Sequence, residues 1–274
     1  MIPAPFEYEV AESADHAVAL LGQHGEDAKL LAGGHSLLPL MRLRLAAPSV
    51  VVDIGRLDEL DYVRENGDTL AIGALATHDR VHRSELLRQH CPLLSHTAGE
   101  IGDPQVRHRG TIGGSVAHAD PASDIPAVLL ALDAELVVHG PGGDRTVPVS
   151  QFFRGIFESA LGPQDVLTEV RVPKVTGGWS YQKFNPRAQD WAIVGVAAQV
   201  RDGRTAVALT NMGETPVRAG AVEEAVAGGA TPAQAAQQAL DGTSPPDDAL
   251  ASAEYRRHLA MVLTRRALEE AAAR

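Results

Sequence analysis

Two glycine-rich segments constrain the fold and chemistry of this chain more than any other feature of its sequence. The first, residues 31–36, contains Gly33-Gly34 and stands between a predicted strand and a predicted helix. The second, residues 110–115, contains Gly113-Gly114. Glycine adopts positive φ and lets a ligand touch the backbone, while successive N–H groups at a helix start attract anions. Two such loops predict a site that holds one pyrophosphate from both sides.

Hydroxyl side chains would add hydrogen-bond donors to these loops, at Ser36, Thr111 and Ser115. Such loops would let a chain with a net charge of −11 bind an anionic cofactor without a basic patch. Neither segment matches G-x-G-x-x-G or G-x-x-x-x-G-K-S/T, which disfavours a nicotinamide Rossmann site and a P-loop nucleotidase. The plain alternative is that both glycine pairs are tight turns without a ligand.

The composition excludes several functional classes. The negative charge and an aromatic content of 4% argue against nucleic-acid binding, because phosphates would be repelled and stacking side chains are few. The one cysteine, Cys91, can neither close an internal disulfide nor hold an iron–sulfur cluster. The N-terminal residues do not read as a signal peptide, and no apolar run approaches the roughly 20 residues of a membrane span. We therefore expect a cytoplasmic chain with no membrane span.

Hydrophobic patterns and turn residues divide the 274 residues into three parts. We predict an N-terminal α/β lobe over residues 1–55, a second α+β lobe over 56–173 and a C-terminal domain over 178–274. In the first lobe the sequence predicts, in order, a helix capped by Ser13, a strand at 29–32, a helix at 37–45 capped by Ser36, and a strand at 50–54.

The other two parts mix strands and helices. In the second lobe, strands are predicted at 69–73, 134–139 and 166–172 (the last half-exposed), helices at 77–88 and 92–101, and mostly irregular chain at 103–124. The C-terminal domain is predicted to form a three-stranded antiparallel sheet from residues 180–184, 192–200 and 205–210, with a hairpin turn at Asp202-Gly203. In the terminal helix, Tyr255, Leu259, Val262 and Leu263 share one face.

Four stretches of the sequence resemble one known family. Residues 32–39 and 111–121, which carry the glycine pairs, resemble the flavin loops of the FAD-binding medium subunit of the carbon monoxide dehydrogenase / xanthine dehydrogenase (molybdenum hydroxylase) family. Residues 181–184 with 189–192 resemble the start of the family's C-terminal domain, and 252–257 with 265–268 resemble its last helix. The likeness covers nearly the whole chain, and the paired motifs in this order are specific.

The resemblance implies an α+β fold of the vanillyl-alcohol-oxidase (PCMH) type. Two α/β lobes would hold FAD non-covalently between them, and a C-terminal lobe of a small antiparallel sheet and helices would follow. No residue is assigned a catalytic role or a metal. The implied cofactor-binding residues are Leu31, Ala32, Gly33, Gly34, His35, Ser36, Thr111, Gly113, Gly114, Ser115, Asp124, Leu161, Lys183 and Trp191.

The resemblance also implies a role for each of these residues. The two loops would hold the pyrophosphate and the adjoining ribityl chain. Asp124 would bind a hydroxyl of the adenosine ribose, Leu161 would lie near the adenine, Lys183 at the pyrimidine edge of the flavin, and Trp191 against the isoalloxazine. Ser115 departs from the family, in which many members have Asn, and this change would weaken FAD affinity.

The implied function is electron transfer within a heterotrimer. A large subunit would carry the molybdenum cofactor, a small subunit two [2Fe-2S] clusters, and this chain FAD, from which an external acceptor takes electrons. The single cysteine fits this division, because the clusters need another chain. The alternatives are a self-contained flavin oxidoreductase, an FAD-poor assembly module, and a hydrolase using Ser36, which lacks the G-x-S-x-G setting.

Several other residues allow both a functional and a structural interpretation. His78 and His82 have a metal-compatible spacing but are expected to form a solvated helix face, and His118, Asp120 and Asp124 are expected to form a structural turn rather than a metal site. Trp191 could equally pack in the core. Cys91 is expected to be an unreactive thiol. The sequence leaves open whether Arg42 and Arg44 meet solvent or a partner, and whether Arg107 and Arg109 steer the cofactor or pair with acids.

Overall fold

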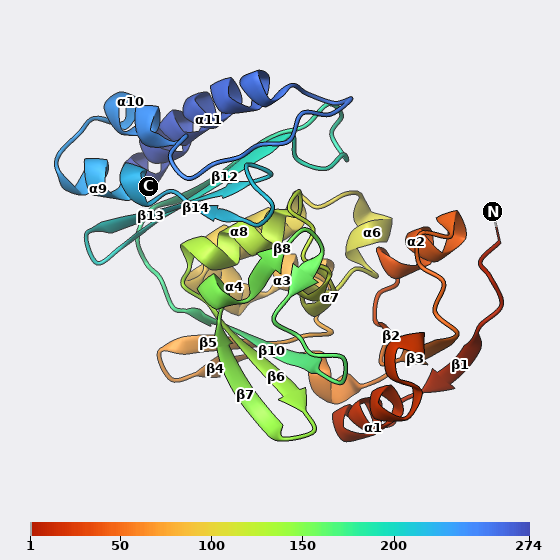
Figure 1. Cartoon of the computed structure of the whole chain (residues 1–274). Coiled ribbons are helices and arrows are strands. Elements are labelled where there is room, and N and C mark those ends of the chain that lie inside the picture. The colour runs from red at the N-terminus through yellow and green to blue at the C-terminus, as the bar shows by residue number, and fades with distance from the viewer. Residues whose placement is uncertain (1) are drawn as a thin grey trace.

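Three sheets follow one another along the chain. The computed structural model describes residues 2–274, so Met1, the first residue of the predicted N-terminal lobe, lies outside the described residues. The sheets have three, five and four strands, and β8 (Phe153–Gly155) and β9 (Glu158–Ser159) form an additional ribbon. Figure 1 shows the N-terminal elements in red at the lower right, the second sheet with its helices in the centre, and the C-terminal helices in blue at the top.

The first sheet is parallel and has the order β1-β3-β2. Its elements are β1 (Glu7–Val10), α1 (Ala14–His24), a 3-10 turn at Gly25–Asp27, β2 (Ala28–Leu31), α2 (Leu37–Leu43) and β3 (Val50–Asp53). The sequence did not predict β1, because its mostly exposed edge position leaves no run of apolar residues. Buried side chains of α1, β2 and β3 form a small core that also includes Leu75 and Val166 from the second part of the chain.

The caps of the two helices differ from each other. Ser13 accepts a hydrogen bond from the N–H of His16, which confirms the predicted cap of α1. Ser36, in contrast, makes no side-chain cap bond to α2, so that expectation was wrong. The reason is its backbone: at φ −109° and ψ −52°, Ser36 is already helical, whereas a capping residue is usually extended.

The second sheet is antiparallel, with the order β4-β5-β10-β6-β7. Its strands are β4 (Val63–Asn66), β5 (Thr69–Gly73), β6 (Glu135–Gly140), β7 (Gly143–Pro148) and β10 (Val166–Pro173), with 3-10 turns at Asp58–Leu60 and Val149–Gln151. The central strand β10 is mostly buried and not half-exposed as expected, because a register shift between Leu167 and Glu169 breaks its alternation.

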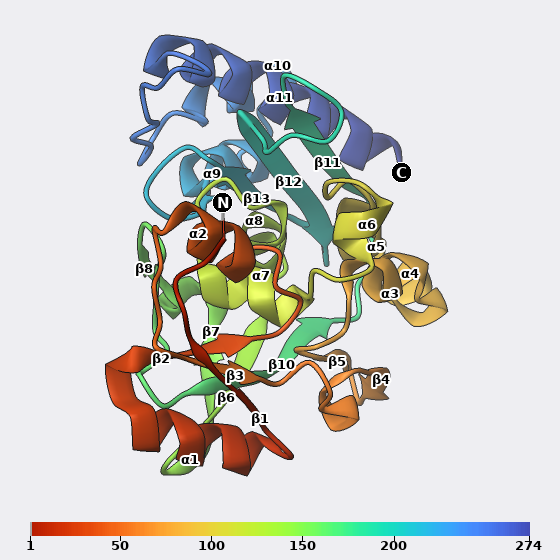
Figure 2. The same cartoon turned by 90° about the vertical axis from the view of Figure 1, so that its right-hand side faces the viewer.

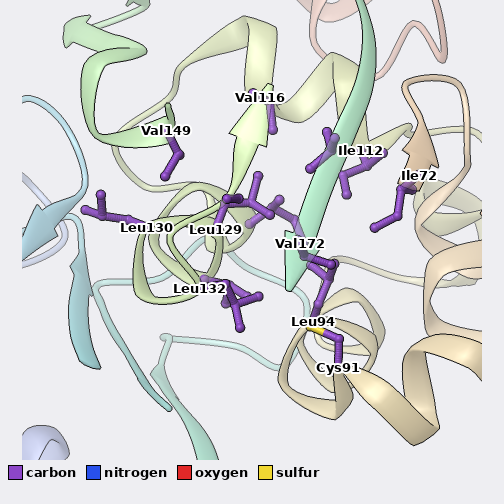
Figure 3. Packing of buried hydrophobic residues seen from close by; sticks show 14 of the residues in the cluster. Ile72, Cys91, Leu94, Ile112, Val116, Leu129, Leu130, Leu132, Val149 and Val172 are labelled. Atoms are coloured by element: carbon purple, nitrogen blue, oxygen red, sulfur yellow. The ribbon is translucent and has the colours of Figure 1, made fainter. Parts of the chain in front are cut away.

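Between β5 and β6 the chain forms six helices. They are α3 (His78–Arg83), α4 (Glu85–His90), α5 (Pro92–Gly99), α6 (Pro104–Arg107), α7 (Ile112–His118) and α8 (Asp124–Ala131). Their apolar side chains meet those of the sheet in one core; Figure 3 shows Ile72, Leu129 and Val172 within it. Cys91 is buried in this core, and burial raises the pKa of its thiol to about 12, which agrees with the expected unreactive cysteine.

Two expectations about these helices were wrong. Residues 77–88 form two helices, because Ser84 is extended and starts α4 by accepting a hydrogen bond from Leu87. Residues 103–124 are about half helical and not mostly irregular, because Asp103 caps α6 and Thr111 caps α7. Each cap stabilises a helix start by about 1 kcal/mol, which offsets the helix cost of one glycine. Gly113 and Gly114 therefore lie in the first turn of α7.

The third sheet is antiparallel and has four strands, where three were predicted. Strands β11 (Trp179–Phe184), β12 (Val194–Arg201) and β13 (Arg204–Thr210) match the prediction, and β14 (Val217–Arg218) is a two-residue edge too short to show a pattern. Asp202 and Gly203 both have positive φ, as the predicted hairpin turn requires. The remaining elements are α9 (Gly220–Ala227), α10 (Pro232–Ala235), a 3-10 turn at Ala236–Gln238 and α11 (Ala253–Ala273).

Helices cover both faces of this sheet. Helix α11 packs on one face, and α8 of the second part packs on the other, so α8 lies between two sheets (Figure 1). Leu259 and Leu263 of α11 are buried as predicted, but Tyr255 is exposed. The buried face of α11 includes Arg256 in place of Tyr255. The Arg256 guanidinium donates hydrogen bonds to the Ile193 carbonyl and to Asp248. None of the helices over residues 2–274 has the length and apolar character needed to cross a membrane.

A histidine joins α1 to the hairpin β6–β7. Nδ1 of His139 lies 2.7 Å from Asp144, and its Nε2 lies 2.7 Å from Asp15 of α1. The contact with Asp144, followed by that with Asp15, raises the pKa of His139 above its ordinary value. The ring therefore bridges the N-terminal helix and the second sheet, and this bridge is an ion pair when the ring is protonated.

Replacing His139 with Gln is expected to destabilise the protein more at pH 6 than at pH 9. Because the pKa is raised in the folded state, the stabilisation is present below the unfolded-state pKa of about 6.5 and is lost as pH rises through the folded-state pKa. Urea unfolding of both proteins at the two pH values measures this difference, with the exposed His258→Gln as the control. A difference that does not change with pH would contradict the ion-pair account.

Candidate functional site

A cleft of about 1040 Å³ lies where the three sheets and their helices approach one another. This volume is at the upper end of the range for small-molecule sites. Thirteen of the fourteen predicted cofactor-binding residues line it, and only Leu31 does not. The cleft thus brings together residues from β2, α7, α8, β11 and the loops between them. Figure 2 shows α2 and α7 between β8 on the left and β11 on the right.

The first glycine loop has the features of an anion-binding nest. The backbone N–H groups of Gly33, Gly34, His35 and Ser36 donate no hydrogen bond to any residue within 2–274. Gly34 has φ +76°, a conformation that glycine adopts without strain. Nδ1 of His35 lies 2.9 Å from the Gly33 carbonyl and holds the turn. Four neighbouring free donors at the start of a helix suit a phosphate group.

The second glycine loop differs, and the expectation that it too is a nest was wrong. The N–H groups of Ile112 and Gly113 donate to carbonyls of Ala76 and Ala74, and those of Gly114 and Ser115 bond to Thr111. These donors are therefore occupied within the chain. Glycine serves here to provide space, which leaves the side-chain hydroxyls as the polar groups on this side.

The atoms nearest to each glycine show why a side chain is absent at that position. A Cβ on Gly33 would lie 1.9 Å from the Arg109 carbonyl, so the first loop packs directly on the chain that leads into the second. A Cβ on Gly113 would lie 2.5 Å from that of Ala74, so this glycine lets α7 approach β5. A Cβ on Gly114 would meet only the Thr111 hydroxyl, at 2.8 Å. Gly114 thus keeps room open in the cleft.

Asp124, Lys183 and Tyr181 form a buried polar cluster at the cleft wall. Nζ of Lys183 lies 2.8 Å from one carboxylate oxygen of Asp124, and the Tyr181 hydroxyl donates to the other at 2.5 Å. Burial raises the pKa of Asp124, and the ammonium of Lys183 opposes this rise. Burial also raises the pKa of Tyr181 well above its ordinary value, so Tyr181 remains a donor.

This contact limits the roles implied by the resemblance. In extended FAD, the adenosine ribose and the pyrimidine edge of the flavin are separated by the pyrophosphate and the ribityl chain. Asp124 and Lys183 touch each other, so they would meet the same part of the cofactor. The assignments of Asp124 to the adenosine ribose and of Lys183 to the flavin edge are therefore incompatible for extended FAD.

Other residues differ from their expected settings. Trp191 precedes β12, is 55% exposed and lines the cleft, so core packing is excluded. His78 is only 5% exposed and is not on a solvated face; burial lowers its pKa to about 4. Residues 2–274 contain no group of His, Cys, Asp and Glu side chains suited to a metal ion. Within the same residues no side chain bonds to the Ser36 hydroxyl, so nothing activates it as a nucleophile.

The sequence analysis missed three ring-bearing residues of the cleft. They are His78, His118 and Phe157. The rings of His118 and Phe157 pack together at 5.0 Å between centroids, and Phe157 has φ +57°, which is rare for an aromatic residue. A pattern of residue types cannot reveal such a backbone conformation. The sequence does mark His78 as the first residue after the helix cap Thr77. Its burial, however, depends on contacts with residues that are distant in the sequence.

Comparison with known families covers almost the whole chain. Residues 4–175 match the model of the FAD binding domain in molybdopterin dehydrogenase, and residues 179–271 match the CO dehydrogenase flavoprotein C-terminal domain. The chain is 43% identical to the carbon monoxide dehydrogenase medium chain of Hydrogenophaga pseudoflava, covering 100% of this chain and 99% of the relative. It is 37% identical to the 6-hydroxypseudooxynicotine dehydrogenase complex subunit alpha of Paenarthrobacter nicotinovorans, with 99% and 96% covered.

Solved structures give the same result. A chain of carbon monoxide dehydrogenase from Hydrogenophaga pseudoflava superposes with a TM-score of 0.97 at 43% identity, covering 100% of this chain and 99% of the other. A chain of quinoline 2-oxidoreductase from Pseudomonas putida 86 gives a TM-score of 0.93 at 30% identity, with 100% and 99% covered. These matches confirm the resemblance seen in the sequence and the fold class that it implied. The chain belongs to the family of FAD-binding chains of the molybdopterin dehydrogenases, which includes the carbon monoxide dehydrogenase medium chains.

Proposed function

We propose that this chain is the FAD subunit of a molybdenum hydroxylase complex and passes electrons from [2Fe-2S] clusters of a partner subunit to an external acceptor. The observation that carries the proposal is the cleft itself. It joins a glycine loop with four free N–H donors to a buried lysine, within residues that match an FAD binding domain. FAD, when bound, supplies a redox centre that accepts and releases electrons; the chain supplies its binding and its electrostatic setting.

The residues present fit FAD. Gly33, Gly34, His35 and Ser36 offer donors to the pyrophosphate, and Gly114 leaves room beside them. Thr111 and Ser115 add hydroxyls at the start of α7. Lys183 brings a cation to the wall, where it favours an electron-rich, reduced flavin, and Asp124 holds this ammonium in place. We retain the full predicted set as binding residues, with Ala32, Gly113, Leu161 and Trp191 as contacts and Leu31 as support for the loop.

The lobes and partners form part of the same proposal. We propose divisions at residues 1–55, 56–173 and 178–274, so that the cleft lies between the first two and is closed by the third. Cys91 is buried and single, so a cluster would have to reside on another chain. The names of the relatives, "medium chain" and "complex subunit", support assembly with a small iron–sulfur and a large molybdopterin subunit. The cytoplasmic location stays a prediction.

The first expectation is stoichiometric FAD in the purified protein. After incubation with FAD and desalting, the absorption spectrum should show about one flavin per chain. Gly114→Val should reduce the retained flavin at least tenfold while the protein stays folded, because the new Cβ meets only the Thr111 hydroxyl and position 114 lines the cleft. Circular dichroism and the urea midpoint check the fold.

Gly113→Ala provides the matched contrast. Its Cβ would clash with Ala74, directly after β5, so it should lower the free energy of unfolding by about 1–3 kcal/mol as an overpacked site. If Gly114→Val retains full flavin, the assigned cofactor path is wrong. A chain that stays colourless even when co-expressed with its partner subunits would favour the assembly-module alternative.

The second expectation concerns the flavin potential. Lys183→Met should lower the midpoint potential, because removing a cation disfavours the reduced flavin. This change also leaves Asp124 buried without its partner, so the double variant Lys183→Met with Asp124→Asn is the control. A spectroscopic redox titration measures all three proteins. An unchanged midpoint in both variants would remove Lys183 from the flavin site.

A further inference from the structure

His78 is built into the junction of the two glycine loops. It is the first residue of α3, whose start is capped by Thr77. Its backbone N–H donates to the Gly110 carbonyl at 2.9 Å. A Cβ on Gly110 would lie 2.9 Å from Cδ2 and 3.3 Å from Nε2 of the His78 ring, so glycine is needed for this approach. Gly33 in turn packs on Arg109 and Gly110. Gly33, Gly110 and His78 therefore form one continuous row.

The His78 ring has no hydrogen-bonding partner within residues 2–274. Nδ1 is fully buried and has no hydrogen bond, and Nε2 makes none with residues 2–274. His78 is among the residues that line the cleft. Nδ1 meets neither a donor nor an acceptor. In a neutral ring we therefore expect the proton on Nε2, the nitrogen that is open to the cleft. An imidazole with a free donor is unusual at such burial, since buried polar groups are normally paired.

Burial, together with nearby charges, keeps the ring neutral without a ligand. Burial, followed by the nearby His35 and Arg107, lowers the pKa of His78 to about 4. Asp79, the adjacent acid on α3, is bonded to Arg83 and lies near His108. The cations on this side would favour an anionic group in the cleft. The free N–H groups of the first loop, which packs on Gly110 through Gly33, favour the same kind of group.

We propose that His78 is a further FAD-binding residue, whose Nε2–H donates a hydrogen bond to a phosphate oxygen of the cofactor where the two loops meet. This inference rests on the proposed function. It assigns a binding role to a residue of α3, outside both glycine loops. It also accounts for Gly110, whose missing side chain lets the ring approach the cleft wall.

The test is equilibrium binding of FAD to the flavin-free chain, purified with co-expressed partners if the isolated chain does not retain flavin. His78→Phe keeps a planar ring and removes the donor, and should raise the FAD dissociation constant about tenfold or more, as expected for a bond to a charged group. His78→Gln places an amide N–H near the position of Nε2 and should recover part of this loss. His108→Gln, an exposed histidine outside the cleft, is the control and should bind like wild type.

Competition with ADP and with adenosine identifies the contacted group. If the bond is to phosphate, His78→Phe weakens ADP by a factor similar to that for FAD and leaves adenosine unchanged. Equal FAD affinity in wild type and folded His78→Phe overturns the inference, as does an equal loss for adenosine. If His78→Phe does not fold, His78→Asn takes its place, because the Asn side chain cannot reach the Nε2 position. A folded His78→Asn that binds FAD as tightly as wild type would then overturn the inference. Failure of the wild type to bind FAD would instead overturn the proposed function.

Discussion

The site depends on one close backbone contact, that of Gly33 with the carbonyl of Arg109. No side chain fits between these two segments, since a Cβ would lie 1.9 Å from the carbonyl oxygen. The contact joins the end of β2 to the chain that leads into α7, so it fixes the two glycine loops relative to each other. The free donors of the first loop, the helix start of the second and the ring of His78 all take their positions from it. A binding site of small residues is rigid here because its backbone is packed.

The C-terminal sheet contributes to the same site through buried charge. Lys183 and Tyr181 of β11 reach Asp124 at the start of α8. A buried ion pair gives little net stability, because desolvation offsets the attraction, but breaking it by removing one partner is costly. Its main effect is positional: a lysine from the third sheet is held at the wall of a cleft formed mainly by the first two. The cluster thus brings a strand and a helix that are far apart in sequence to one wall of the cleft.

The sequence predicted those features that depend on local pattern. Strands 69–73 and 205–210, the cap at Ser13 and the turn at Asp202-Gly203 agree with the structure because apolar periodicity and turn chemistry act over a few residues. The prediction failed where a distant partner decides. His78, for example, is buried because the distant Gly110 lets it approach. Residues 103–124 were mispredicted for a local reason: caps at Asp103 and Thr111 outweigh the glycines, so about half of these residues are helical. The resemblance supplied the set of cleft residues, but not that Asp124 and Lys183 touch.

Helix α8 has a consequence for how the chain is organised as a unit. All eight of its residues are buried, and sheets lie on both sides of it. Apart from Asp124, which is paired with Lys183, its side chains are apolar, and a helix buried on every side has no face to present to water. The segment matching the FAD binding domain therefore does not end at a finished surface, and removing the C-terminal domain would leave α8 uncovered. The boundary between the two matched segments is therefore a boundary in sequence similarity, and α8 is covered only when both segments are present.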